Sequence, residues 1–203
     1  MRIATWNVNS IRSRIDRVEA WLARSQVDVL AIQESKAKDE QFPYDRFRAL
    51  GYQVAHHGVS QWNGVAIASR VGLDDVQVGF DGAPGWGEPA TAEARAIGAT
   101  CGGIRMWSLY VPNGRALEDP HMAYKLTWLD RLRDQATGWA ADGTPVAGIG
   151  PSQPSIGSGA ATYQQAVGEA NGNPIVGGSE HDLQLYDRNR TTLLDSSITR
   201  SGG

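Results

Sequence analysis

The amino-terminal stretch of the chain decides its fold class, with residues 2–8 reading RIATWNV and residues 27–33 reading VDVLAIQ. The first segment alternates and is rich in residues that favour β-structure, which predicts an opening strand. The second is a short, nearly continuous apolar run, typical of a strand buried on both faces. Between them, Ser10 can cap a helix whose apolar residues recur at helical spacing: Ile11, Ile15, Val18 and Leu22, with Trp21 beside them. Such a strand–helix–strand opening places the chemistry of a domain at the carboxyl ends of its strands.

Further strands and a second helix are predicted along the rest of the first 150 residues. Gly102-Gly103 separates two apolar segments and forms a good two-residue hairpin turn. Asp119-Pro120 marks a helix start, because Asp can cap a helix and proline suits its first position. We therefore expect a helix after residue 119 and strands at residues 52–56, 64–69, 94–101, 104–111 and 145–149. Together these elements predict an α/β (α+β) domain with mixed strand directions.

The composition of the chain changes abruptly near Gly150. All seven Trp and all three Phe lie before residue 140, whereas residues 149–203 contain nine Gly, seven Ser and no Trp, Phe or Lys. A segment with so few large apolar side chains does not complete a core. We expect residues 1–150 to form the folded region and residues 151–203 an atypical Gly/Ser-rich tail. Within the tail, Ala160–Ala170 could form a short helix and Asp182–Tyr186 a short strand.

Charge and cysteine content exclude several classes of protein. The net charge of −3 argues against a binder that neutralises nucleic acid by bulk positive charge, although an enzyme can still carry a local basic rim. Cys101 is the single cysteine, so neither an intrachain disulfide nor a cysteine-based zinc site can form. This usage fits a reducing compartment, and we expect a cytoplasmic protein. No apolar run has the length of a signal peptide or a membrane span, so we expect no membrane partner.

Polar side chains that can carry chemistry stand where predicted strands end. Asn7 ends the first strand and Glu34 follows the second, so a carboxamide and a carboxylate converge at one rim. Hard oxygen ligands of this kind suit Mg²⁺, which usually keeps several of its waters. Tyr110 and Asn113 follow a later strand, where a phenol and an amide can donate hydrogen bonds to phosphate oxygens. Each residue also has a simpler interpretation, as a turn residue, a solvated acid or a half-buried sheet residue.

Five segments occur in the order and approximate spacing of the motifs of a known family. They are TWNVNS at residues 5–10, DVLAIQESK at 28–36, GVAIAS at 64–69, SLYVPNGR at 108–115 and YKLTWL at 124–129. On these motifs, residues 1–150 resemble the exonuclease III family, the AP endonuclease type within the endonuclease/exonuclease/phosphatase superfamily. The QESK and YVPNG segments point to the DNA repair branch of that superfamily.

The resemblance implies roles for five residues of this chain. Glu34 matches the metal-binding glutamate of the family, Asn7 the asparagine beside that metal, and Tyr110 the active-site tyrosine near the scissile phosphate. Asn113 would be a nearby polar contact, and Lys36 sits where the motif has its lysine, as a contact to the DNA. Arg115 is a further candidate for a phosphate contact, because it stands next to the turn at Asn113. The implied cofactor is Mg²⁺, for which Mn²⁺ can substitute, and the implied reaction is phosphodiester hydrolysis by a metal-activated water. The implied substrates are double-stranded DNA, degraded from 3′ to 5′, and abasic-site DNA, which is incised.

The resemblance ends after residue 150. The family continues Gly-Asp-x-Asn, in which the Asp activates or positions the attacking water, whereas this chain carries Pro151 and Gln153 at those positions. The closing Ser-Asp-His of the family has its nearest counterpart in Ser179–Asp182, which we do not expect to substitute for it. The family implies a four-layer α/β sandwich, of which residues 1–150 supply the front half with a mixed sheet. We expect the second sheet, built from the back half, to be incomplete, and the first to expose an apolar face through which the chain can associate.

The sequence leaves three functions open. The first is a Mg²⁺-dependent DNA repair nuclease, impaired in this chain because Pro151 occupies the general-base position. The second is a non-catalytic, truncated fragment that retains part of a DNA-binding rim. The third, a phosphatase of the same superfamily, is disfavoured by the QESK and YVPNG motifs. Two other features are not expected to be functional: His56 and His57 point to opposite faces of a strand, and Trp62 is expected to pack structurally.

Overall fold

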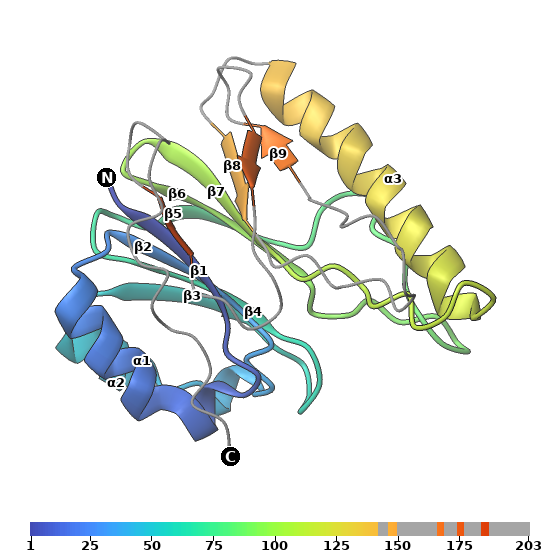
Figure 1. Ribbon diagram of the computed structural model, residues 1–203. Coiled ribbons are helices and arrows are strands. Elements are labelled where there is room, and N and C mark those ends of the chain that lie inside the picture. Colours follow the sequence, from blue (N-terminus) through green and yellow to red (C-terminus); the bar gives the residue numbers. More distant parts are fainter. Residues whose placement is uncertain (142–145, 150–165, 169–173, 177–183, 187–203) are drawn as a thin grey trace.

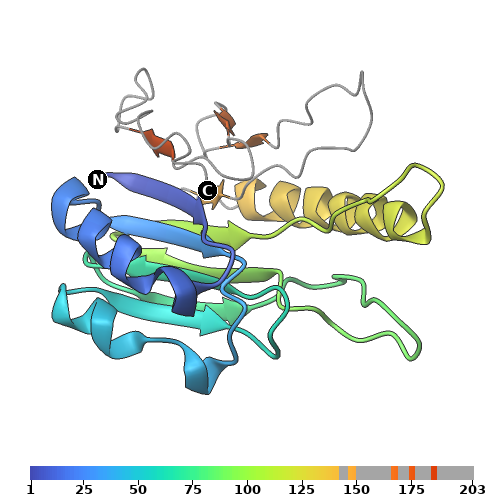
Figure 2. The same cartoon turned by 60° about the horizontal axis from the view of Figure 1, so that its bottom comes forward.

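The computed structural model describes residues 1–141, 146–149, 166–168, 174–176 and 184–186. Two β-sheets lie face to face between helices, giving four layers (Figures 1 and 2). The predicted mixed α/β fold is therefore confirmed. No helix among the described residues is long and apolar enough to cross a membrane.

The first sheet has the strand order β11-β1-β2-β4-β3. Its strands are β1 (Ile3–Asn7), β2 (Val29–Gln33), β3 (Gln53–His57), β4 (Val65–Ser69) and β11 (Gln184–Tyr186). The pair β1 and β2 is parallel, and the other neighbours are antiparallel. Every residue of β2 and of β4 is buried, as expected from their continuous apolar sequences.

Two helices, α1 (Ile11–Ser25) and α2 (Tyr44–Ala49), cover the outer face of this sheet (Figure 1), and a short 3₁₀ turn, Asp39–Gln41, precedes α2. Ser10 caps α1 as predicted, because its hydroxyl accepts a hydrogen bond from the backbone N–H of Ser13 at 3.4 Å. The buried apolar residues of α1 form one cluster with those of β2 and β4, namely Ile11, Val18, Trp21, Leu22, Leu30, Ile32, Ala66 and Ala68. Burial of this stripe holds the helix on the sheet.

The second sheet has the strand order β5-β6-β7-β8. Its strands are β5 (Asp74–Val78), β6 (Ala96–Cys101), β7 (Ile104–Leu109) and β8 (Val146–Ile149). The predicted turn at Gly102-Gly103 joins β6 to β7, and both glycines have the positive φ that this turn requires, 56° and 80°. Helix α3 (Pro120–Ala141) begins at the predicted proline and packs Tyr124, Trp128 and Leu132 against the outer face of the sheet.

The inner faces of the two sheets cover one another. The buried cluster between them joins Val29, Ala31, Val65 and Ile67 of the first sheet to Ile97, Ala99, Cys101 and Met106 of the second. The expectation that this face would lie uncovered for want of residues beyond 150 is therefore wrong. Apolar alternation identifies strands but not the sheet each one joins, and β5 to β8 form the partner sheet from residues 74–149.

The described pieces of the tail form short strands. β9 (Ala166–Gly168) pairs antiparallel with β10 (Pro174–Val176), so the helix expected at Ala160–Ala170 is wrong at residues 166–168, where Val167 favours extended structure and Gly168 disfavours a helix. Of the strand expected at Asp182–Tyr186, residues 184–186 are confirmed as β11, which pairs with β1, and the rest lies outside the described residues. The departures from the family motifs, Pro151, Gln153 and Ser179–Asp182, lie outside the described residues.

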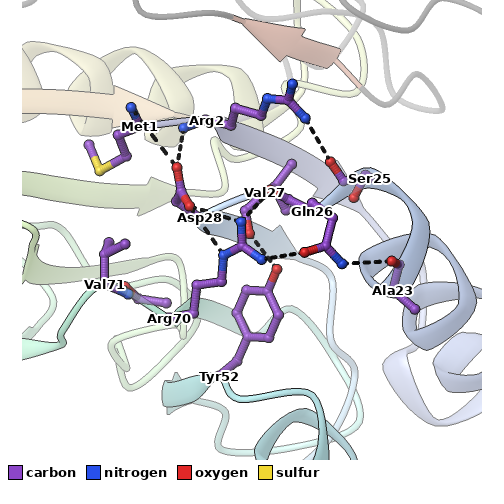
Figure 3. A network of polar contacts seen from close by, with 11 residues as sticks. Met1, Arg2, Ala23, Ser25, Gln26, Val27, Asp28, Tyr52, Arg70 and Val71 are labelled. Carbon is purple, nitrogen blue, oxygen red and sulfur yellow. Dashed lines mark hydrogen bonds and ion pairs between the residues drawn. The ribbon is translucent and has the colours of Figure 1, made fainter.

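A polar network fastens the amino-terminal ends of β1 and β2 (Figure 3). The carboxylate of Asp28 accepts hydrogen bonds from the backbone N–H of Arg2 at 2.6 Å and from Nε of Arg70 at 3.1 Å. Arg70 also donates to Oε1 of Gln26 at 2.9 Å, and the hydroxyl of Tyr52 donates to the carbonyl of Val27. The network fixes the register of the strands whose opposite ends carry the candidate site.

Candidate active site

Asn7 and Glu34 lie side by side at the carboxyl ends of β1 and β2. Asn7 is in register with Gln33, and the carbonyl of Glu34 accepts the backbone N–H of Ser10 at 2.7 Å. The amide Nδ2 of Asn7 donates to Oε1 of Glu34 at 2.9 Å, and each residue is 8% exposed. The parallel pairing of these strands therefore brings the two predicted residues together.

Tyr110 and Lys36 complete the contacts of the Glu34 carboxylate. Tyr110 follows β7 of the second sheet, and its hydroxyl donates to Oε1 of Glu34 at 2.6 Å, so the cluster spans both sheets. The ammonium of Lys36 lies 3.1 Å from Oε2 of Glu34 and also donates to the side chain of Asn9. Four of the six predicted residues thus meet at one carboxylate.

The electrostatics of this cluster favour an ionised Glu34. Burial alone would raise the pKa of this carboxyl, but hydrogen bonds from Tyr110, Asn7 and Lys36, with the charge of Lys36, hold it below its ordinary value. Three donors that face one carboxylate stabilise its charged form more than desolvation disfavours it. The site therefore presents a fixed negative charge at neutral pH.

A second ion pair, between Arg95 and Glu93, lies against Tyr110. The guanidinium of Arg95 lies 5.0 Å from the centroid of the Tyr110 ring, and Nη1 of Arg95 donates to the carbonyl of Tyr110 at 3.3 Å. Nε of Arg95 donates to Glu93 at 2.7 Å, and Glu93 also accepts hydrogen bonds from Asn63 at 2.8 Å and from Tyr124 at 3.0 Å. This pair was not predicted from the sequence, although its signal is two opposite charges spaced by one residue just before an apolar strand.

Asn113 and Arg115 take part in a turn beside the cluster. The side-chain oxygen of Asn113 accepts the backbone N–H of Arg115 at 2.8 Å, and the carbonyl of Asn113 contacts Nδ1 of His121. The side chain of Arg115 is exposed. In the part of the chain that the structure describes, the Glu34 carboxylate itself is contacted by Asn7, Tyr110 and Lys36 and not by Asn113 or Arg115.

The two features discounted from the sequence have different environments. His56 is turned into the interior, where its ring faces Ser35 and Asp39. Trp62, expected to pack structurally, is instead 64% exposed on the loop between β3 and β4. The expectation failed because the loop's polar residues give this indole no apolar surface to cover it.

The donor set at Glu34 is compatible with a hard divalent cation. Among the described residues no group of three or more His, Cys, Asp or Glu side chains gathers, so an ion would rest on the Glu34 carboxylate and water, with Asn7 beside it. Nδ2 of Asn7 faces Glu34, and its Oδ1 accepts the backbone N–H of Asn9 at 3.0 Å. Mg²⁺ is bound in this manner, by one or two carboxylates with several retained waters. The ammonium of Lys36 lies 3.1 Å from Oε2 of Glu34, so a bound ion would share the carboxylate with this charge.

A four-layer sandwich with a buried carboxylate, a carboxamide and a phenol at its strand ends defines a class of hydrolytic protein. Residues 4–148 match the Endonuclease/Exonuclease/phosphatase family, and the chain belongs to that family. The resemblance seen in the sequence is thereby confirmed.

Individual relatives point to the nuclease members of this family. The chain is 38% identical over 80 residues to the exodeoxyribonuclease III of Haemophilus influenzae, covering 39% of this chain and 30% of that protein. The solved AP endonuclease of Archaeoglobus fulgidus is 38% identical, with a TM-score of 0.67, covering 74% of this chain and 56% of the other. The 3′ phosphatase NExo from Neisseria, solved with a product DNA hairpin, is 33% identical, with a TM-score of 0.68, covering 75% and 57%. The chain thus spans little more than half the length of these structures.

Proposed function

We propose that the protein is a Mg²⁺-dependent DNA repair nuclease, a 3′–5′ exodeoxyribonuclease and abasic-site endonuclease, whose turnover is impaired in this chain. The observation that carries the proposal is the ionised carboxylate of Glu34, held by Asn7, Tyr110 and Lys36 at the junction of the two sheets. Exodeoxyribonuclease III and AP endonuclease relatives support the same substrate class.

Glu34, with Asn7 beside it, would hold the metal, Mg²⁺ or in its place Mn²⁺. Such an ion supplies Lewis-acid stabilisation of charge on a phosphoryl oxygen and a more acidic bound water. The residues of the chain fix where this happens, because the hydrogen bonds from Asn7 and Tyr110 hold the carboxylate in one orientation. A carboxylate that is already held in one orientation does not have to be reoriented when the metal binds.

The same rim carries groups that suit the phosphates of double-stranded and abasic-site DNA. The amide of Asn113 would donate a hydrogen bond to a phosphate oxygen, and the cations of Lys36 and Arg115 would offset the phosphate charge. The single proton of the Tyr110 phenol is donated to Glu34 in the structure, so Tyr110 would donate to a phosphate oxygen only by leaving that carboxylate. A DNA hairpin bound to the Neisseria relative supports DNA as the partner. Cys101, free and buried, fits a cytoplasmic protein.

Impairment is proposed from the residues that replace the Gly-Asp-x-Asn motif. Pro151 has no acid or base in its side chain, and Gln153 stands where the family carries Asn. Loss of a general acid or base alone lowers a rate by roughly 10² to 10⁴. Pro151 also favours the second candidate, a protein that binds DNA at the Glu34 rim without cleaving it.

Cleavage of a fluorescent duplex with a single abasic-site analogue tests the proposal. The protein and its Glu34→Ala variant would be assayed with Mg²⁺ and then with EDTA, with Glu40→Ala as the matched control at an exposed carboxylate. Slow incision that needs Mg²⁺ and disappears only in Glu34→Ala supports the nuclease. Binding of the duplex by fluorescence anisotropy without incision supports the non-catalytic binder, and neither binding nor incision refutes both.

A further inference from the structure

Ser35 stands between two residues that share an unusual backbone conformation. Glu34 and Lys36, which flank it, have φ values of 53° and 48°, in the left-handed region that non-glycine residues seldom adopt. Residues held in this way persist only where their surroundings over-determine the conformation. The neighbours of this segment must therefore hold it in place.

Every polar group of Ser35 has a partner inside the protein. Its N–H donates to the carbonyl of Gly64 at 3.2 Å, and its carbonyl accepts the N–H of Ile11 at 2.9 Å. Its hydroxyl lies 2.8 Å from Nε2 of His56, and the residue is 0% exposed. Ser35 therefore ties the end of β2 to the start of α1, to β4 and to β3.

The other nitrogen of His56 faces a carboxylate. Nδ1 lies 2.8 Å from Oδ1 of Asp39, an oxygen that also accepts the backbone N–H of Gly58 at 2.8 Å. The ring N–H is not aligned with that oxygen, so the contact is electrostatic rather than an ideal hydrogen bond. The His56 side chain is 0% exposed and lies against the ring of Phe42, with centroids 4.4 Å apart.

The roles of donor and acceptor along this chain follow from the carboxylate. Burial lowers the pKa of His56 to about 4, so the ring is neutral at pH 7 and carries one proton. The Asp39 oxygen 2.8 Å from Nδ1 favours the tautomer that carries the proton on that nitrogen. Nε2 is then an acceptor, and the hydroxyl of Ser35 donates to it.

Serine, histidine and aspartate in this order resemble the triad of serine hydrolases, but burial excludes that role. A nucleophile has to reach its substrate, and Ser35 is wholly covered by protein. A buried hydrogen-bonded chain of this kind instead fixes the residues beside it.

We propose that Ser35, His56 and Asp39 are positioning residues, which hold Glu34 and Lys36 in the left-handed conformations that orient them at the site. The inference deepens the proposed function and rests on it for the use of Glu34 in catalysis. The positioning itself concerns the geometry of this chain and is measurable without metal or DNA.

The test reads the Glu34 carboxylate through its hydrogen bond with Tyr110. In protein labelled with ¹³C at tyrosine Cζ, the resonance that disappears in Tyr110→Phe is assigned to Tyr110, one of the six tyrosines. The Glu34→Gln variant gives the chemical shift of Tyr110 when its hydrogen-bond partner is neutral. Ser35→Ala, which removes one oxygen, and His56→Phe, which keeps a ring against Phe42, are expected to move the resonance most of the way to the Glu34→Gln position.

Two controls separate positioning from general destabilisation. Tyr52→Phe removes a buried hydrogen bond far from the site and should lower Tm without moving the Tyr110 resonance. Asp39→Asn keeps an acceptor for His56 and should leave the resonance in place, whereas Asp39→Ala should move it. An unmoved resonance in Ser35→Ala and His56→Phe, despite a lower Tm, overturns the proposal. Absence of DNA cleavage would refute the nuclease but leave this result standing.

Discussion

Acidification is expected to destabilise the fold through the buried ring of His56. Its side chain is 0% exposed, and burial lowers its pKa from 6.5 to about 4, although the Asp39 carboxylate acts in the opposite direction. The unfolded chain binds a proton at this residue near pH 6.5, whereas the folded chain does so only near pH 4. Stability therefore rises with pH between these two values and is lost as pH falls through them.

The linkage relation gives the size of this effect. Between pH 7 and pH 5, a histidine with these two pKa values lowers the free energy of unfolding by about 1.8 kcal/mol. The pKa of Glu34 lies below its ordinary value of 4.5, so the contribution of Glu34 to stability is lost chiefly below pH 5. Burial also lowers the pKa of His57, which adds a loss of the same sign.

Urea unfolding at pH 7 and at pH 5 measures the loss in the natural protein and in His56→Phe. The variant keeps an aromatic ring beside Phe42 and cannot titrate, while His57 remains in both proteins. The natural protein should lose about 1.8 kcal/mol more than the variant over this interval. Equal losses would refute the reasoning, because they would mean that His56 is not held neutral in the folded state.

Two further substitutions test the packing around the site. Gly64→Ala should cost about 3 kcal/mol or more in urea unfolding, because φ is +91° there and a Cβ would overlap the hydroxyl of Ser35. Gly103→Ala, at φ +80° with nothing within 4 Å, should cost only about 1–2 kcal/mol, and equal losses would contradict the steric argument. Asp28→Asn should lower stability by about 1–3 kcal/mol through its bonds to Arg2 and Arg70, and a change near zero would show that this network does not contribute.

Local patterns predicted the elements that carry a single strong signal. The cap at Ser10, the turn at Gly102-Gly103 and the proline that opens α3 were found from residue chemistry alone. β5 was missed because its residues are mostly exposed and polar, and α2 because it has six residues and buries only Phe47. Neither segment has the periodic pattern of apolar residues from which a helix or strand is predicted.

The sequence predicted those site residues that stand at the ends of strands. Asn7, Glu34 and Tyr110 follow from their places at strand ends, and the family motif added Lys36. The assignment of strands to two facing sheets depends on contacts distant in sequence, which periodicity does not encode. The contacts that hold the site residues in place, such as that of His56 with Ser35, could not be predicted for the same reason.

Calorimetric titration with Mn²⁺ tests most directly the claim that Glu34 is the centre of a metal site. The protein, Glu34→Ala and the exposed control Glu40→Ala would be titrated under identical conditions, without DNA. Binding to the protein and to Glu40→Ala, with no measurable binding to Glu34→Ala, is the predicted result. Equal binding by Glu34→Ala, or no binding by the protein itself, would contradict the account.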